Sequence, residues 1–334
     1  MKTKFGMSVV VFLIAAFAFL SAAVFSAVVP AADGGVRIVS DRQLVAEAGV
    51  LQGDENGLTA AYWEKETTRL QAAILFLRLK GLEQEALSFR STDNFADAGL
   101  VWPGGRAILA YLKAHPELGW AGVGGNRFDP LAVITGQQLY KVLLETLGYK
   151  QDVDFRYEDV PAFARSLGIG ARVGLTKVRN KHLAGALVEL LSAKPKGGMK
   201  TVGELLAAFD PSIAAKLGAI PSSGIRVVDH GHGAMLTDEA GMTLYYFARD
   251  AADLDACKAT CLQKWPIFYR ENLYLPAELD PADVGVLVRP DGAKQITYRG
   301  WPLYYFADDK APGDMKGAGV NNVWFAAQPE LPVR

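Results

Sequence analysis

Hydrophobic positions follow a helical period over the first two thirds of the chain. Gln137–Leu147 and Lys181–Leu191 each place leucines along one face, at the spacing of an amphipathic helix. Thr68–Leu79 is apolar on nearly every side, which is typical of a helix buried in a bundle. Residues 40–218 are therefore predicted to be mostly helical, with a short closing helix around Val202–Phe209.

Three of these predicted helices are variants of one another. The shift that superposes the first on the second moves Gly81 onto Gly148, and each glycine is placed to end its helix. A shorter shift, which moves Leu143 onto Leu187, superposes the leucines of the second helix on those of the third. Thr68 and Thr135 are predicted N-caps. The unequal shifts exclude a strict solenoid and predict three degenerate repeats of a helix–loop–helix unit.

The last third of the chain changes to a pattern of strands and hairpins. Gly241–Asp250 recurs as Gly300–Asp309 with seven identical residues in ten, and the same shift places Trp265 on Trp324. A turn precedes each aromatic segment, and the turn residues at 290–292 predict a further hairpin. We expect a β-rich domain built from two related repeats.

The N-terminus has the pattern of an export signal. Lys2 and Lys4 precede Phe5–Val29, which carries no charge. Cleavage after Ala31 would remove this leader, but the segment is also long enough to span a bilayer as a retained anchor. We therefore expect the protein to be exported.

The predicted fold class is multidomain α+β. The predicted parts of the chain are a signal peptide or membrane anchor (1–31), a helical domain (32–218), a linker (219–226) and a β-rich domain (227–334).

Composition removes several classes of function. The 35 Lys and Arg against 36 Asp and Glu give a net charge of -1, which argues against non-specific nucleic-acid binding. Two cysteines are too few for a disulfide scaffold or an all-cysteine metal site, and no CxxCH for haem attachment is present. Common hydrolase, metalloprotease, phosphate-binding and dinucleotide-binding motifs are also missing from the sequence. We therefore expect a protein that is not an enzyme and needs no cofactor.

Residues 41–215 resemble the S-layer homology (SLH) domain in three degenerate copies. The resemblance rests on Asn94–Asp97, Trp102, Ala110–Gly119, Gly122–Pro130 and Ile134-Thr135. It implies a helical bundle with a pseudo-threefold arrangement, which fastens exported proteins to acidic cell-wall polysaccharide.

The signature arginine of that family is kept in one copy. Thr68–Gln71 retains the threonine and Arg69, Thr135–Gln138 has no arginine, and Arg179 in the third copy is only suggestive. An arginine fork pairs well with a carboxylate such as a pyruvyl group. The resemblance thus implies weak polysaccharide binding, or binding at one site. Its candidate residues are Arg69, Asp97 and Trp102. The alternatives are a solvated charge at a helix start for Arg69, a turn or cap residue for Asp97, and a core residue or part of a groove wall for Trp102.

The last third resembles the bacterial secreted repeat of unknown function, a family of exported proteins. Its Y-x-(F/W/Y)-x-x-D motif occurs twice, as Tyr245, Phe247, Asp250 and as Tyr304, Phe306, Asp309. The family pattern of two cysteines followed by Trp-Pro is matched as well. We expect the motif aromatics to form one face of a core together with one exposed ring, and the two aspartates to cap turns. The resemblance implies fold and export, and no established activity.

Cys257 and Cys261 lie close together in a chain predicted to leave the reducing cytosol. A short-loop disulfide is the favoured interpretation. A redox-active pair, or a metal site completed by His230 and His232, is the alternative.

These patterns predict a non-catalytic exported protein of the bacterial cell surface. Its helical part would bind cell-wall polysaccharide or surface-layer proteins, and its repeats would be displayed. The alternative is a redox or metal-handling accessory of the envelope that uses Cys257 and Cys261. Self-association of the helical part and membrane anchorage through residues 5–29 stay open.

Overall fold

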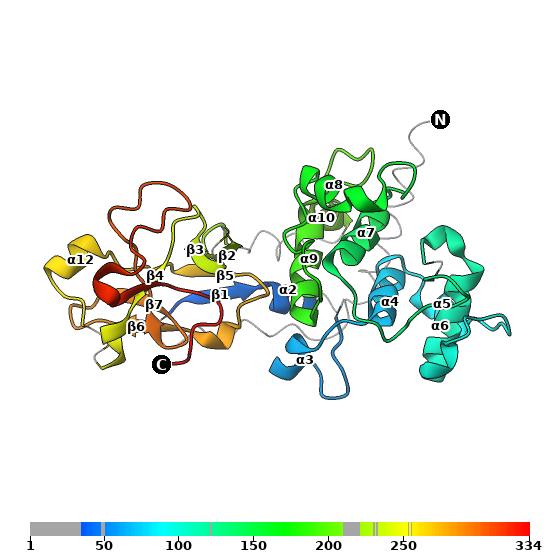
Figure 1. Ribbon diagram of the computed structural model, residues 1–334, viewed down its shortest axis with the longest axis horizontal. Helices are drawn as coiled ribbons and strands as arrows, with labels where there is room; N and C mark the ends of the chain where they lie inside the picture. The colour runs from blue at the N-terminus through cyan, green and yellow to red at the C-terminus, as the bar shows by residue number, and fades with distance from the viewer. Residues whose placement is uncertain are drawn as a thin grey trace. The chain divides into compact units, whose positions relative to one another are not determined.

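The chain forms two compact units in the computed structural model, which describes residues 35–47, 51–120, 122–209, 221–229, 231, 233–252, 254 and 256–334 (Figure 1). The helical unit lies within Leu44–Gly218. The repeat unit combines the described residues up to Gln43 with those after Ala219. Each unit is described by itself below.

Two predictions concern residues outside these ranges. The predicted leader and the pair His230 and His232 are not among the described residues. Within the described ranges, no helix has the length and apolar character needed to cross a membrane.

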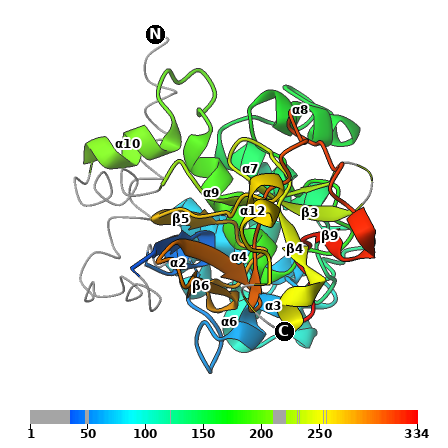
Figure 2. The same ribbon diagram turned by 90° about the vertical axis from the view of Figure 1, so that its left-hand side faces the viewer.

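The helical unit is built from short helices joined by glycine-containing loops (Figure 2). The three helices predicted from the leucine pattern are present, and α7 packs against both α4 and α9. The α-helices after the boundary helix α2 (Asp41–Glu47) are α3 (Ala60–Glu64), α4 (Arg69–Leu79), α5 (Glu83–Ser88), α6 (Pro103–Ala114), α7 (Gly136–Thr146), α8 (Val160–Ser166), α9 (Asn180–Ser192) and α10 (Val202–Phe209).

Local chemistry explains where α4 and α7 begin. The Thr68 hydroxyl accepts the Gln71 N–H at 3.3 Å, and the Gln71 side chain accepts the Thr68 N–H at 2.8 Å. Thr135 and Gln138 form the same capping box, at 3.2 and 2.9 Å. Both N-cap predictions are confirmed.

The segments before α4, α7 and α9 join in a closed ring of backbone hydrogen bonds. The Thr67 N–H donates to the Val178 carbonyl at 2.8 Å, and the Val178 N–H donates to the Ile134 carbonyl at 2.9 Å. The Ile134 N–H completes the ring by donating to the Thr67 carbonyl at 3.0 Å. The two shifts that superpose the helices also superpose these three positions. The helices α4, α7 and α9 therefore each begin two residues after one of the three residues of this ring.

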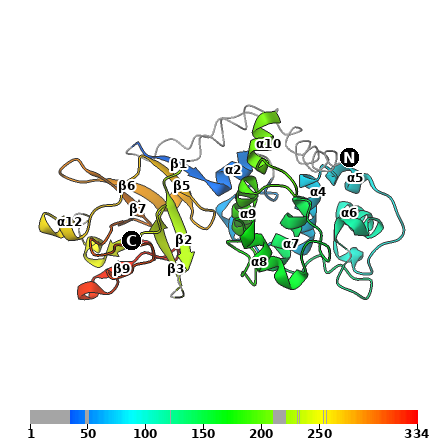
Figure 3. The same ribbon diagram turned by 90° about the horizontal axis from the view of Figure 1, so that it is seen from above.

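The repeat unit consists of small sheets (Figure 3). Hairpins pair β2 with β3 and β6 with β7, and β8 adds to the second hairpin. The strands β4 and β9, one from each repeat, pair in antiparallel fashion. The strands are β1 (Arg37–Ser40), β2 (Ile225–Asp229), β3 (Ala234–Asp238), β4 (Tyr245–Phe247), β5 (Asn272–Leu275), β6 (Val284–Val288), β7 (Lys294–Tyr298), β8 (Trp301–Pro302) and β9 (Trp324–Ala326), with the short helix α12 (Thr260–Lys264).

The segment before the helical unit belongs to the repeat unit. Strand β1 pairs in parallel with β5, as Figures 1 and 3 show. Arg42 donates to the Ala277 carbonyl at 2.8 Å and pairs with Asp280 at 3.0 Å. Residues 32–218 were predicted to form one helical domain, whereas the structure places the described residues up to Gln43 in the repeat unit. A strand as short as β1 has too little pattern to reveal a partner that follows the helical unit in the sequence.

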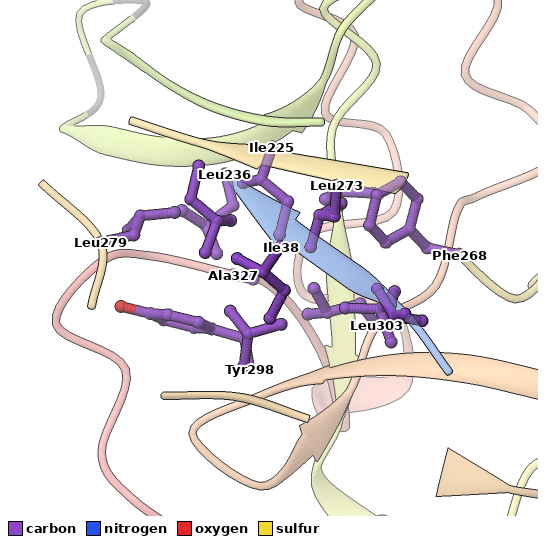
Figure 4. Close-up of a cluster of buried hydrophobic side chains, with 14 of the residues drawn as sticks. Ile38, Ile225, Leu236, Phe268, Leu273, Leu279, Tyr298, Leu303 and Ala327 are labelled. Carbon is purple, nitrogen blue, oxygen red and sulfur yellow. The ribbon is translucent and has the colours of Figure 1, made fainter. Parts of the chain in front are cut away.

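Strand β1 also completes the hydrophobic core of the repeat unit. Figure 4 shows Ile38 among side chains from both repeats and from the segment between them. Ile38 is 7% exposed, and most of its neighbours are fully buried. The labelled neighbours are Ile225, Leu236, Phe268, Leu273, Leu279, Tyr298, Leu303 and Ala327.

Candidate functional site

Each repeat places the segment around its tryptophan against the other repeat. Strand β9 of the second repeat pairs with β4 of the first, and the Ala248 N–H donates to the Val323 carbonyl at 2.8 Å. In the opposite direction, the Ala307 N–H donates to the Lys264 carbonyl, also at 2.8 Å. The shift that relates the two motifs exchanges these two pairs. The two repeats are therefore interlocked, and neither has its full set of backbone partners alone.

The motif tyrosines and aspartates meet across the repeats. The Tyr245 hydroxyl donates to Asp309 Oδ2 at 2.6 Å, and the Tyr304 hydroxyl donates to Asp250 Oδ2 at 2.9 Å. All four side chains are buried. Phe247 and Phe306 are buried as well, so the prediction of one exposed motif ring was wrong. Asp250 also accepts the backbone N–H of residue 256 at 3.3 Å, and Asp309 accepts that of residue 316 at 3.0 Å. Each aspartate thus fixes its own loop and the tyrosine of the other repeat.

The two tryptophans stack at the centre of this arrangement. Trp265 and Trp324 are parallel within 3°, with ring centroids 3.7 Å apart. Phe306 covers Trp265 at 4.4 Å, and Phe247 covers Trp324 at 4.2 Å. Each phenylalanine therefore belongs to the repeat opposite its tryptophan. Aromatic contacts of this kind add to the stability that burial alone provides.

Burial changes the pKa values of the aspartate and tyrosine side chains in this core. It raises the pKa of Asp250 to about 7, although the Tyr304 hydroxyl, a backbone N–H and the charges of Arg289 and Arg334 favour the ionised form. Burial also raises the pKa of Tyr245 and Tyr304 well above the ordinary value, and their bonds to carboxylates add to that effect. Both tyrosines are therefore protonated donors at neutral pH.

Cys257 and Cys261 form the predicted disulfide, with Cα atoms 5.3 Å apart. Cys257 is fully buried in the aromatic core, and Cys261 is half-buried beside it. Within the described ranges, no group of three or more His, Cys, Asp or Glu residues is suited to hold a metal ion. The predicted metal site includes His230 and His232, which lie outside the described residues, so it stays a prediction. The redox alternative gains no support from the disulfide.

In the helical unit, Arg69 occupies an unusual position. Its guanidinium carbon lies 5.0 Å from the ring centroid of Phe128 and 5.5 Å from that of Trp120. Arg69 Nε and Trp120 Nε1 are buried donors that have no hydrogen-bond partner in the described part of the chain. Burial lowers the pKa of Arg69, while Asp129 and Tyr157 oppose this shift. An arginine remains protonated at neutral pH in spite of such a shift.

The other two candidate residues have different surroundings. Asp97 accepts the backbone N–H groups of Phe128 and Asp129 at 3.0 and 2.8 Å, so it holds the loop that places Phe128 beside Arg69. Burial alone would raise the pKa of Asp97, but these bonds lower it below the ordinary value. Trp102 is 52% exposed in front of α6, and no described contact joins it to Arg69.

The positions equivalent to Arg69 in the other two segments are Gly136 and Asn180. A Cβ atom on Gly136 would lie 2.2 Å from a backbone oxygen of Arg172, so no larger side chain fits there. Asn180 is buried and bonds to the Thr67 hydroxyl at 2.9 Å. Arg179, which the sequence suggested for the third copy, pairs with Glu64 at 3.0 Å. Among these three helix starts, Arg69 therefore has no counterpart.

Sequence reasoning missed Trp120. It precedes the glycine-rich loop 122–125, and its aromatic character there suits an ordinary core residue. Only the structure shows that its N–H lacks an acceptor among the described residues, beside a second such donor.

Comparison with known proteins supports the assignment of the C-terminal repeats. Residues 226–268 and 285–328 match a family model described as "Secreted repeat of unknown function". The match indicates an exported protein. No curated protein and no solved structure matches the chain. The resemblance of the helical unit to the SLH domain has no support from these comparisons.

Proposed function

We propose that this protein is a non-catalytic exported protein of the cell surface, whose helical unit binds an acidic cell-wall polysaccharide at Arg69 and whose repeat unit is displayed. Export is supported by the repeat-family match and by the N-terminal pattern of lysines and apolar residues. The binding site is supported by the donors of Arg69 and Trp120, which lack acceptors among the described residues.

Buried donors in folded proteins nearly always have acceptors, and an unsatisfied one costs about 1–3 kcal/mol. Two such donors on neighbouring side chains, with the Arg69 guanidinium carbon 5.5 Å from the centroid of the Trp120 ring, are the observation that carries the proposal. A carboxylate would provide acceptors for both and would pair with the guanidinium fork. The aromatic rings of Trp120 and Phe128 provide apolar surface against which the body of a sugar can pack.

The ring that joins residues 67, 134 and 178 supports the SLH-like part of this proposal. It arranges three equivalent helix starts around one point, as the pseudo-threefold family arrangement requires. Because Gly136 and Asn180 replace the arginine at the other two starts, we expect one binding site per chain.

The test is co-sedimentation of the exported protein with purified wall polysaccharide. We expect Arg69→Ala to weaken binding by about tenfold to a hundredfold, the factor that corresponds to a lost charge-assisted hydrogen bond of about 1.5–3 kcal/mol. Arg90→Ala is the matched control, because this exposed arginine contacts only backbone carbonyls in the described structure.

A second arm uses the same polysaccharide after its carboxylates have been removed. Loss of binding to that material, with wild-type binding intact on the untreated glycan, supports recognition of the acidic group. Equal retention of Arg69→Ala and wild type would refute the assignment. Retention that is independent of glycan and accompanied by a larger mass in solution would indicate self-association of the helical unit.

A further inference from the structure

The aromatic core of the repeat unit contains a stacked pair of tryptophans, a tyrosine next to that pair and an aspartate that can accept the tyrosine's proton. Together these groups can relay a single electron. Trp265 and Trp324 are stacked at 3.7 Å, and Tyr245 lies edge-on to Trp265 at 5.5 Å. The Tyr245 hydroxyl donates to Asp309 at 2.6 Å. These four side chains are at most 7% exposed, so water has little access to the phenolic proton.

This geometry suits coupled transfer of an electron and a proton. A stacked indole pair loses an electron more readily than a single indole, because the positive charge spreads over both rings. A phenol that loses an electron becomes a strong acid, so a base must take its proton at the same time. Asp309 is in position to do so, and the Gly317 N–H donates to the phenol oxygen at 3.3 Å. The phenoxyl oxygen keeps that second hydrogen bond.

We propose that the repeat unit donates single electrons to oxidants that an exported protein meets, such as high-valent metal centres or oxygen-derived radicals. The oxidant removes one electron from the Trp265–Trp324 pair. Tyr245 returns an electron to the indole while its proton moves to Asp309, which leaves a neutral tyrosyl radical and a protonated carboxyl. A small reductant of the thiol or ascorbate class then supplies one electron, and the proton returns from Asp309 to the phenol oxygen.

The second tyrosine is a less favourable endpoint. Tyr304 lies edge-on to Trp324 at 5.2 Å and donates to Asp250 at 2.9 Å. This hydrogen bond is longer than the 2.6 Å bond from Tyr245 to Asp309, so the phenolic proton has farther to move. A carboxyl that already carries a proton cannot accept another from the phenol, and the raised pKa of Asp250, about 7, leaves it partly protonated at neutral pH. The radical is therefore expected on Tyr245 rather than on Tyr304.

Photogenerated ruthenium(III) tris(bipyridine) supplies the oxidant in the test, and electron paramagnetic resonance after rapid freezing identifies the radical. We expect a neutral tyrosyl radical in the full-length protein and tryptophan radicals in Tyr245→Phe. Asp309→Asn should slow tyrosyl formation about tenfold, equivalent to about 1.4 kcal/mol in the activation free energy. Tyr246→Phe is the matched control, since successive side chains of β4 point to opposite faces. It should leave the signal unchanged.

An undiminished tyrosyl yield in Tyr245→Phe, or an unchanged rate in Asp309→Asn, would overturn the relay. A measurement on the wild type avoids any loss of folding in these variants. Tyrosyl formation should be slower in D2O than in H2O, since the phenolic proton moves in the same step. Equal rates in the two solvents would also overturn the relay.

Discussion

The repeat unit and the helical unit are both built from related segments, but they differ in whether their buried hydrogen-bond donors have acceptors. In the repeat unit, each tyrosine of the motif finds its acceptor in the other repeat. In the helical unit, Arg69 has no equivalent at the other two helix starts, and its Nε has no acceptor among the described residues. Because each repeat supplies the acceptor for the tyrosine of the other, these two hydrogen bonds fix how the two repeats pack together. The donor without an acceptor beside aromatic rings is the feature on which the proposed binding site rests.

The largest effect should come from removing one member of the shared stack. Trp324→Ala deletes contacts with Trp265, Phe247 and Tyr304 at once. We expect the repeat unit to lose about 3–5 kcal/mol of unfolding free energy, while the helical unit keeps its helices. Urea unfolding followed separately by near- and far-UV circular dichroism measures both. Trp102→Ala, which alters a half-exposed ring, is the control and should change stability by about 0.5 kcal/mol or less.

The protonation of Asp250 should make stability depend on pH. Burial raises the pKa of this carboxyl to about 7 in the folded state, so the folded chain binds the proton more tightly than the unfolded chain does. The stabilisation is complete below the ordinary pKa of 3.8 and is lost as pH rises through about 7. Relative to Asp250→Asn, wild type should lose up to about 1.4 kcal/mol per pH unit between these values.

The matched comparison for this effect is an aspartate with the opposite shift. The bond from Lys316 and two backbone N–H groups lower the pKa of Asp314 to about 2. Its contribution is present above pH 3.8 and is lost as pH falls through about 2, so Asp314→Asn should destabilise the protein above pH 3.8 and make little difference below about pH 2. If urea midpoints of wild type and Asp250→Asn stayed parallel from about pH 4 to 8, the assignment for Asp250 would be wrong.

The next effect tests how tightly the interlocked core is packed. A Cβ atom on Gly317 would lie 2.9 Å from both the Trp265 ring and the Tyr245 ring. Gly317→Ala should therefore destabilise the repeat unit by about 1–3 kcal/mol through overpacking. Gly174→Ala in the helical unit is the control, because nothing lies within 4 Å of its added Cβ atom. Equal thermal shifts for the two variants would contradict the tight contact.

The caps of the helical unit should give a smaller effect. Thr68→Ala removes the side-chain acceptor for the Gln71 N–H at the start of α4. We expect a loss of about 1 kcal/mol in unfolding free energy, and a similar loss for Thr135→Ala. Thr68→Ser keeps the hydroxyl and should restore most of the stability. If all three variants unfolded at the same temperature as wild type, the capping boxes would contribute nothing measurable.

Local features of this fold could be predicted from the sequence. Thr68 and Thr135 were identified as N-caps because a cap involves residues within a single helical turn. The disulfide was predictable because its two cysteines are neighbours in the sequence of an exported chain. In both cases the partners lie within about one turn of each other.

Long-range pairings were not predictable. Tyr245 and Asp250 occur in one motif, yet the acceptor of Tyr245 is Asp309, in the other repeat. Strand β1 is too short for its pattern to reveal β5. Trp120 resembles a core residue in the sequence, since only the three-dimensional packing determines whether its N–H has an acceptor. A single sequence identifies which residues are buried better than which residues meet.

The smallest effect on stability should come from Arg69, and its sign separates a ligand site from a structural contact. Arg69→Met removes a buried donor that lacks an acceptor in the described structure, which favours the variant, but it also removes the interaction of the cation with Trp120 and Phe128. These contributions oppose each other, so we expect the unfolding free energy to stay within about 1 kcal/mol of wild type. Thermal unfolding measures this change, and co-sedimentation with wall polysaccharide measures binding on the same sample. A variant that is as stable as wild type but no longer binds shows that the arginine is kept for a ligand. A loss of several kcal/mol would instead make Arg69 a structural residue of the helical unit.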